Sequence, residues 1–365
     1  MAVATSDPIE AARALALSST QSAARTEREG TLPRPLVDEL AAAGLFRLCL
    51  PRELDGPEVG PRVLVEVFAT LARGDGAAGW CTMIGATSGL VAGSLPREAA
   101  AAIYGDPLVI SGGVYAPLGR AEPADGGYRV SGRWPFASGC RHCDWLMGGC
   151  LVDGAVPRLA LVPAGSARII ENWEVAGLRG TGSHDIAIDD VHVPAAHTAS
   201  LLADRPWPAG VLYRLPIFGM LAVGIAAVAL GIGQGAIDDL IADPGRPSSR
   251  VQAAVARAQA QLAAARALLE LELDRAFEQA SAGGEVEPAR RAALRLAASH
   301  AAHTAAEVAR AMFELAGASA IHERHPLQRR FRDAHVATHH VMVAPATFPV
   351  VGRVLMGLDV AGGEL

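Results

Sequence analysis

The chain has 365 residues, of which 51% are hydrophobic and 19% charged, and its formal net charge is −6 at pH 7. Phosphate binding needs a clustered basic surface, so this balance argues against a nucleic-acid partner and favours a soluble globular protein. The length predicts two or three packed units rather than one simple core. Five cysteines, an odd number, do not make a disulfide framework, so a reducing cytoplasm is the expected location.

The first part of the sequence, residues 1–106, is predicted to form an α-helical domain. Its N-terminus has no basic region followed by a long apolar run, so no secretory signal is expected. Helical runs or helical apolar spacing occur over 9–18, 36–45 and 63–71. Within the second of these, Gly44 is typical of a glycine that ends a helix.

Residues 107–210 are predicted to form a β-barrel domain. Short apolar runs alternate there with turn residues, a spacing that favours a compact barrel or sandwich over βαβ units. Asp-Gly-Gly at 125–127 predicts a hairpin turn. The strand-like run at 186–193 has an irregularity at its two central aspartates, 189–190.

The last part, residues 211–365, is predicted to form a helical bundle. Residues 215–237 contain no charged side chain and are long enough to span a bilayer. Their many glycines and alanines, and the lack of a flanking basic cluster, favour the centre of a soluble bundle, so no membrane partner is expected. A second long helix is predicted over 251–280, and a third begins at Pro288 and stops at Gly317.

The short motif C-x-x-C, formed by Cys140 and Cys143, raises the question of a metal or redox site. His142 lies inside the motif and Cys150 follows it. A structural zinc site needs a second ligand pair, and a thioredoxin-like site needs a βαβ setting; neither is evident. We therefore interpret these cysteines as small, half-buried hydrophobic side chains and predict no metal.

Four longer stretches together resemble the acyl-CoA dehydrogenase superfamily. They are GDGAAGW (74–80), GGYRVSGRWPFASGC (126–140), GLRGTGSHDIAIDDVHVP (177–194) and AGASAIHERHPLQRRFRDAHVATHH (316–340). The resemblance covers nearly the whole chain and implies an α+β fold: an N-terminal α-helical domain, a central β-barrel domain and a C-terminal four-helix bundle. It also implies a homo-oligomer, either a dimer or a tetramer.

The superfamily contains two chemistries, and the dehydrogenase branch requires a glutamate that removes the substrate α-proton. In one of its usual places, nine residues after the arginine that Arg332 matches, this sequence has Val341. The other usual place is also empty, because no Asp or Glu occurs between Asp204 and Asp238. A general base must reach its proton, so these gaps argue against dehydrogenation.

The motifs WPFASGC and GLRGTGS, and the histidine after the RDA segment, most resemble the second branch, the two-component flavin-dependent monooxygenases. This resemblance implies reduced FMN or FAD supplied by a separate flavin reductase. It implies reaction with O2 to a C4a-hydroperoxyflavin, and hydroxylation of a small aromatic or polycyclic substrate. The R-x-x-F-G pattern that dehydrogenases use on the FAD pyrophosphate is not evident around 243–250, which favours a loosely held flavin.

The resemblance also assigns site residues. His340 and Ser138 are the predicted catalytic residues, with His339 as a further candidate. The imidazole of His340 is expected either to hydrogen-bond the hydroperoxide or to deprotonate a phenol. The predicted cofactor-binding residues are Trp80, Phe136, Ser138, Gly139, Arg179, Thr181 and Ser183.

One departure from the family pattern leaves alternatives open. Related monooxygenases often have a histidine eight residues after the tryptophan that Trp80 matches, and this chain has Ser88 there. The alternatives are an acyl-CoA dehydrogenase-type enzyme with a relocated base and a catalytically silent binding subunit. Arg332 and Asp333 are interpreted as a structural ion pair of the bundle.

Overall fold

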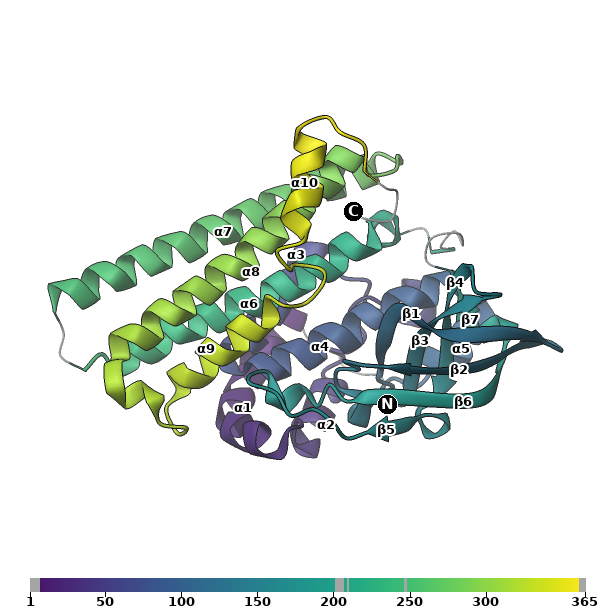
Figure 1. Ribbon diagram of the computed structural model, residues 1–365, viewed down its shortest axis with the longest axis horizontal. Coiled ribbons are helices and arrows are strands. Elements are labelled where there is room, and N and C mark those ends of the chain that lie inside the picture. Colours follow the sequence, from purple (N-terminus) through teal and green to yellow (C-terminus); the bar gives the residue numbers. More distant parts are fainter. Residues whose placement is uncertain (1–6, 201–206, 209, 246–247, 361–365) are drawn as a thin grey trace.

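The computed structural model describes residues 7–200, 207–208, 210–245 and 248–360. Helices come first, strands follow, and helices return at the end (Figure 1). The N-terminal helices are α1 (Pro8–Glu29), α2 (Arg34–Ala42), α3 (Pro61–Gly74), α4 (Gly76–Ser88) and α5 (Arg97–Tyr104). The C-terminal helices are α6 (Ile217–Ala242), α7 (Ser249–Ser281), α8 (Pro288–Ala316), α9 (Pro326–Ala337) and α10 (Thr347–Leu355). The expected fold class is confirmed.

Helix ends follow the local signals in the sequence. Pro288 is the first residue of α8, where its missing N–H costs nothing, and Gly317 ends that helix with φ 66°. Gly44, the second residue after the end of α2, adopts φ 72°, as predicted. The stretch 316–340, one of the four that resemble the superfamily, forms a helical turn and then α9, which packs on α6 and α8.

The strands form one mixed sheet in the order β5-β6-β2-β1-β3-β4-β7. Their bounds are β1 (Ser111–Ala124), β2 (Gly127–Trp134), β3 (Trp145–Val152), β4 (Val156–Pro163), β5 (Arg168–Ile170), β6 (Asp185–Pro194) and β7 (Thr198–Ala199). Strand β1 pairs antiparallel with β2 and parallel with β3. Strand β4 also contacts β6, which is not its sheet neighbour, so the sheet curls on itself like a barrel.

Two sequence predictions about this sheet are confirmed. The β1–β2 hairpin turns at Gly126, whose φ is 70°. The irregularity in β6 is a register shift against β2, with Asp190 at φ 50°. Inside the curl, Trp134 is fully buried and donates from Nε1 to the carbonyl of Gly149 at 2.7 Å. Residues 201–206 and 209, at the end of the predicted β domain, lie outside the described residues.

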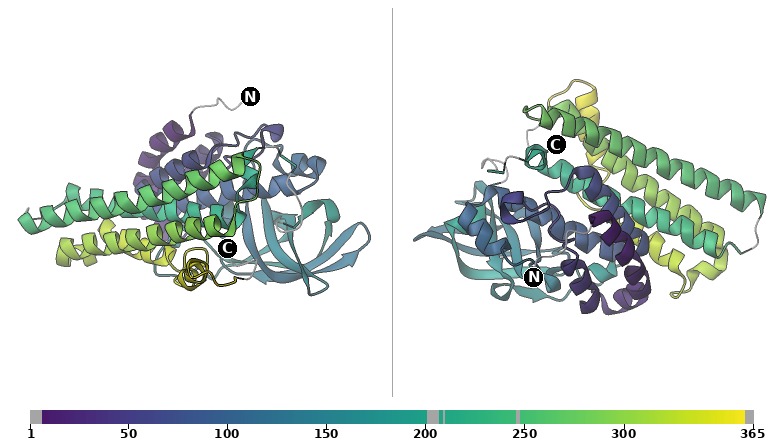
Figure 2. Two further views of the ribbon diagram at one scale, coloured as in Figure 1. Left: turned by 90° about the horizontal axis from the view of Figure 1, so that it is seen from above. Right: turned by 180° about the vertical axis from the view of Figure 1, so that it is seen from behind.

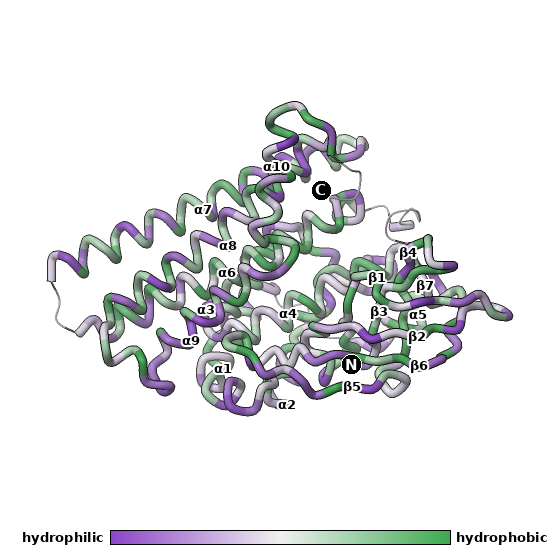
Figure 3. The backbone as a smooth tube through the Cα atoms, in the orientation of Figure 1, coloured by the Kyte–Doolittle hydropathy of each residue, from purple (hydrophilic) through white to green (hydrophobic). Residues whose placement is uncertain are grey.

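Helix α6 is the centre of the bundle. It is long and apolar enough to cross a membrane, yet 83% of its most apolar window is buried inside the protein, against α3, α8 and α9. Figure 3 shows α6 white and green over most of its length, whereas α7 alternates with purple. This pattern matches a central bundle helix and a more peripheral amphipathic one.

The bundle and the curled sheet lie at opposite ends of the molecule, and α4 runs between them (Figures 1 and 2). Helix α4 contacts α6 and α9 on one side and β1 on the other. Every residue of α4 except Ile84 is buried. A residue on α4 can therefore touch loops from both the sheet and the bundle.

Candidate active site

Loops from the sheet and the bundle meet at Trp80 on α4. The loop after β2 carries Ser138, and the turn before β6 carries Thr181 and Ser183. The turn after α9 carries His340. The structure thus brings together five predicted site residues that lie far apart in the sequence.

The two sheet loops are joined to each other by backbone hydrogen bonds. The amide of Gly139 donates to the carbonyl of Thr181 at 2.8 Å, and the amide of Ala137 donates to the carbonyl of His184 at 3.0 Å. Gly139 has φ 69°, a conformation that glycine adopts without strain. This pairing holds the Ser138 side chain beside the turn that carries Ser183.

The hydroxyl groups form a chain whose direction is determined at both ends. The indole Nε1–H of Trp80 donates to Ser138 Oγ at 3.0 Å, and Thr181 Oγ1 donates to the carbonyl of Leu178 at 2.8 Å. Between them, Ser183 Oγ lies 2.7 Å from Ser138 Oγ and 2.6 Å from Thr181 Oγ1. A hydroxyl has one hydrogen, so Ser183 donates to Thr181, and Ser138 donates to Ser183.

This direction defines what Ser138 can offer to a ligand. Its only hydrogen is used on Ser183, and one of its two lone pairs accepts from Trp80. One lone pair is left. Ser138 therefore presents a hydrogen-bond acceptor, in a side chain that is almost fully buried.

His340 offers the opposite function. Its ring lies 5.8 Å from the Trp80 ring in an edge-to-face arrangement. Burial, and then the positive charge of Arg295, lowers the pKa of His340 to about 4, so the imidazole is neutral at neutral pH. Nδ1 accepts from the amide of Met342 at 3.2 Å. The proton must therefore sit on Nε2, which makes His340 a hydrogen-bond donor.

Four other predicted residues lie at the edge of this cluster or outside it. His339 is exposed, and so is Arg179, whose guanidinium is 3.9 Å from Glu27. The exposed ring of Phe136 lies 6.0 Å from that of Trp173, and its backbone has φ 65°, a strained conformation. Gly139 contributes backbone only, as described above.

Two charged residues near the site, Asp333 and Arg295, are not among the predicted site residues. The sequence predicted an ion pair between Asp333 on α9 and Arg332, and this pair does not form. Asp333 instead accepts from the amide of Leu178 at 2.6 Å. Arg332 pairs with Glu27 instead, at 2.8 Å. Arg295 on α8 is buried and acts electrostatically on His340. An alignment that showed unvarying charges at these positions would have been the only available signal.

The cysteines of the C-x-x-C motif face backbone carbonyls. Cys140 Sγ donates to Gly182 and Cys143 Sγ to Gly139, each at 3.5 Å. Burial raises the pKa of Cys140 to about 11 and raises that of Cys143 as well. Within the described ranges, no three His, Cys, Asp or Glu side chains are grouped as metal ligands would be. These thiols are protonated and unreactive at neutral pH.

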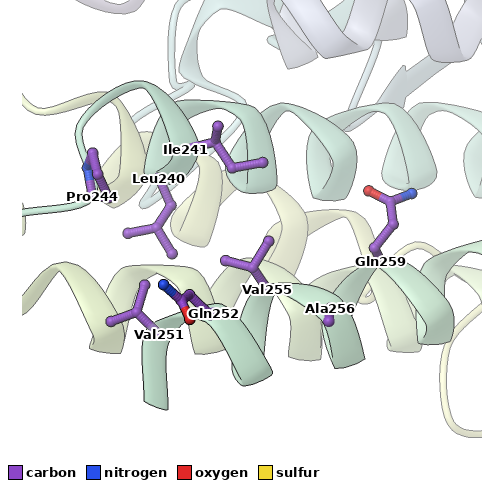
Figure 4. Close-up of a pocket in the computed structure, with 8 residues that line it drawn as sticks. All are labelled: Leu240, Ile241, Pro244, Val251, Gln252, Val255, Ala256 and Gln259. Carbon is purple, nitrogen blue, oxygen red and sulfur yellow. The ribbon is translucent and has the colours of Figure 1, made fainter. Parts of the chain in front are cut away.

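A separate pocket of about 560 Å³ lies between the end of α6 and the start of α7 (Figure 4). Its lining is apolar apart from two glutamines: Leu240, Ile241, Pro244, Val251, Gln252, Val255, Ala256 and Gln259. None of the predicted site residues lines it. The R-x-x-F-G pattern would fall within 243–250. Two residues of that stretch, 246–247, are not among the described residues.

Comparison with known families and proteins agrees with this geometry. Residues 8–102 match the model of the acyl-CoA dehydrogenase N-terminal domain, and residues 223–345 match that of the acyl-CoA dehydrogenase C-terminal domain. The chain is 33% identical over 356 residues to an indole-3-acetate monooxygenase of Pseudomonas putida, covering 93% of this chain and 91% of that protein. It is 30% identical over 350 residues to the flavin-dependent monooxygenase oxygenase subunit HsaA of Rhodococcus jostii, covering 88% and 91%.

Solved structures show the same relationship. The 3-HSA hydroxylase from Rhodococcus sp. RHA1 superposes with a TM-score of 0.93 at 27% identity, over 99% of this chain and all of that chain. XiaF from Streptomyces sp., solved in complex with FADH2 and glycerol, has a TM-score of 0.91 at 25% identity, over 98% and 97%. The chain belongs to the acyl-CoA dehydrogenase superfamily, and within it to the flavin-dependent monooxygenases.

Proposed function

We propose that this protein is the oxygenase component of a two-component system that hydroxylates a small aromatic substrate with reduced flavin and O2. One observation supports the proposal most strongly. A buried acceptor, Ser138, and a neutral donor, His340, both contact the same tryptophan, Trp80. Val341, where a dehydrogenase would have its base, is an exposed apolar residue.

The donor set of the site fits a reduced flavin. Reduced flavin carries a hydrogen on N5, whereas oxidised flavin has a lone pair there. The free lone pair of Ser138 suits the N5–H of the reduced form. When bound, the flavin supplies the reducing equivalents that activate O2 and deliver one oxygen atom to the substrate. Trp80, Ser138 and Ser183 are nearly inaccessible to solvent, so they would exclude water from the reacting atoms.

His340 is assigned a positioning role toward the substrate. Its Nε2–H can donate to a phenolic oxygen or another acceptor on an aromatic ring. This tautomer supports hydrogen-bond donation by His340 over direct deprotonation of the substrate. A base would need its free lone pair on Nε2, and that nitrogen carries the proton.

The partners follow from the same proposal. An oxygenase component needs a separate flavin reductase, and the relatives HsaA and resorcinol hydroxylase are named as such components. Exposed apolar side chains at the end of α10, namely Leu355, Met356 and Leu358, support a homo-oligomer, dimeric or tetrameric. The five free cysteines are in keeping with a cytoplasmic location.

The test is product formation from chemically reduced flavin. The protein is mixed with reduced FMN or FAD, oxygenated buffer and indole-3-acetate or another aromatic probe, and products are separated by chromatography. We expect a hydroxylated product from the wild type and from S131A, whose hydroxyl accepts from the backbone amide of Asp190 at the β-bulge. S138A should release more hydrogen peroxide and form less product than the wild type. A wild type that forms only peroxide with every aromatic probe and either flavin contradicts the proposal.

A further inference from the structure

Arg295 on α8 is a buried arginine without a counter-ion. Its side chain is only 7% exposed, and its Nε has neither solvent nor a hydrogen-bond partner among the described residues. Two other arginines are equally buried, but both are satisfied. Arg47 donates to the carbonyls of Tyr104 and Asp106, and Arg330 donates to Asp239 and to two carbonyls.

Two further polar residues lie along α8 beside Arg295. Ser299 and His303 follow it at intervals of four residues, so all three lie along one face of α8. His303 shows what covers this face: its Nε2 is 3.1 Å from the carbonyl of Val343, and its ring is 5.7 Å from that of Phe348. The covering segment is thus the turn after α9 together with the start of α10.

Two hydroxyl groups in this layer lack a partner. The Oγ of Ser299 on α8 and the Oγ1 of Thr347 on α10 are both fully buried, and neither forms a hydrogen bond within the described part of the chain. Helices α8 and α10 pack against each other. The Nε of a guanidinium and two hydroxyls, all buried and without a hydrogen-bond partner, are unfavourable in an empty protein and favourable around a bound anion.

The same layer connects to the proposed active site. His340 lies on the segment that covers α8, and the charge of Arg295 is the second cause, after burial, of its lowered pKa. Within the described ranges, no aspartate or glutamate pairs with Arg295, and burial is the one cause of its own lowered pKa. The positive charge is therefore near the donor that would hold the substrate, and it is not neutralised by the protein.

We propose that Arg295, assisted by the hydroxyls of Ser299 and Thr347, binds a carboxylate on the aromatic substrate. This inference rests on the proposed function, because it assumes that the space beside His340 receives the substrate. The planar guanidinium matches a carboxylate with two parallel N–H···O bonds, and hydroxyls donate to the remaining lone pairs. The substrate class is then an aromatic acid rather than a neutral phenol or a hydrocarbon.

The experiment compares binding of an acid and its neutral amide. Indole-3-acetate and indole-3-acetamide, and likewise phenylacetate and phenylacetamide, are titrated by calorimetry into wild type, R295M, R295K and R310M. Arg310 is the matched control, since it lies on α8 but is exposed and paired with Glu314. We expect wild type and R310M to prefer the acid by about 10- to 100-fold. The preference should vanish in R295M and be intermediate in R295K.

Thermal unfolding separates ligand binding from a structural role. Because the buried Nε of Arg295 has no hydrogen-bond partner among the described residues, unliganded R295M should melt no lower than the wild type. The acid should raise the melting temperature of the wild type but not of R295M. A large loss of melting temperature in unliganded R295M would instead assign the arginine a structural role.

Three further results would overturn the inference. They are a wild type that binds acid and amide equally or binds neither, an R295M variant that keeps the acid preference, and an R295M variant that weakens FMN binding while acid binding is unchanged. The last result would mean that Arg295 holds the flavin phosphate. Failure of the proposed function is distinguishable from failure of this inference. In that case the wild type would still prefer the acid over the amide, but it would form no hydroxylated product.

Discussion

Asp333 links the bundle to the hydroxyl chain, and replacing it with asparagine tests that link through pH. Its carboxylate accepts from the amide of Leu178, whose carbonyl in turn accepts from Thr181 at the end of the chain. Burial, together with the charges of Asp75 and Glu27, raises the pKa of Asp333 from its ordinary 3.8 to about 7. The backbone bond from Leu178 opposes this shift without cancelling it.

The sign of the effect follows from the two pKa values. Between the unfolded and folded values the native state holds a proton that the unfolded chain has lost, so stability falls as the pH rises through this window. Integrating over the interval from about pH 5 to about pH 8, Asp333 removes roughly 3 kcal/mol from the free energy of unfolding. Asparagine keeps an oxygen acceptor for Leu178 and cannot ionise, so D333N should not show this loss.

The assay is urea unfolding of wild type and D333N at several pH values, followed by tryptophan fluorescence. The difference in unfolding free energy between the two proteins should shift in favour of D333N by roughly 3 kcal/mol from about pH 5 to about pH 8. D189N, which removes an exposed carboxylate of β6, is the control and should give a constant difference. A pH-independent difference between wild type and D333N would refute the assignment of a protonated, buried Asp333.

The other predictions concern the site itself. S138A removes the acceptor for the reduced flavin, so the ratio of product to hydrogen peroxide should fall about 5- to 10-fold; an unchanged ratio contradicts the role of Ser138. His340 is already neutral at neutral pH, so the acid limb of the wild-type rate should appear near pH 4 and not near the ordinary 6.5 of histidine. H340N keeps an N–H donor and should retain more activity than H340A; equal losses would argue against donation. C143A should leave activity and metal content unchanged, because the thiol donates to the carbonyl of Gly139 and not to a site residue's side chain.

The sequence predicted the residues that belong to local motifs and missed those defined by burial. Ser138, Thr181 and Ser183 stand in recognisable loop motifs, and the structure joins them in one hydrogen-bonded chain. The direction of that chain could not be predicted, because it depends on Trp80, 58 residues away in sequence from Ser138, and on the Leu178 carbonyl.

Arg295 and Asp333 illustrate the limit of local patterns. Arg295 stands in an alanine-rich helix with other arginines close by, and no residue type or spacing distinguishes it from an exposed helix arginine. Its burial follows from the segment that covers α8 after the chain has passed through α9. Asp333 contacts Leu178 across 155 residues of sequence, and its neighbour Arg332 suggested an ion pair that does not form.

The most direct test of the central claim is the origin of the oxygen atom in the product. Wild-type protein, reduced flavin and indole-3-acetate, or whichever aromatic acid binds best, are reacted under ¹⁸O₂ in ordinary water and analysed by mass spectrometry. A monooxygenase predicts a hydroxylated product that carries a single labelled oxygen atom. A product with oxygen from water alone, or a desaturated product with no added oxygen, would contradict the account.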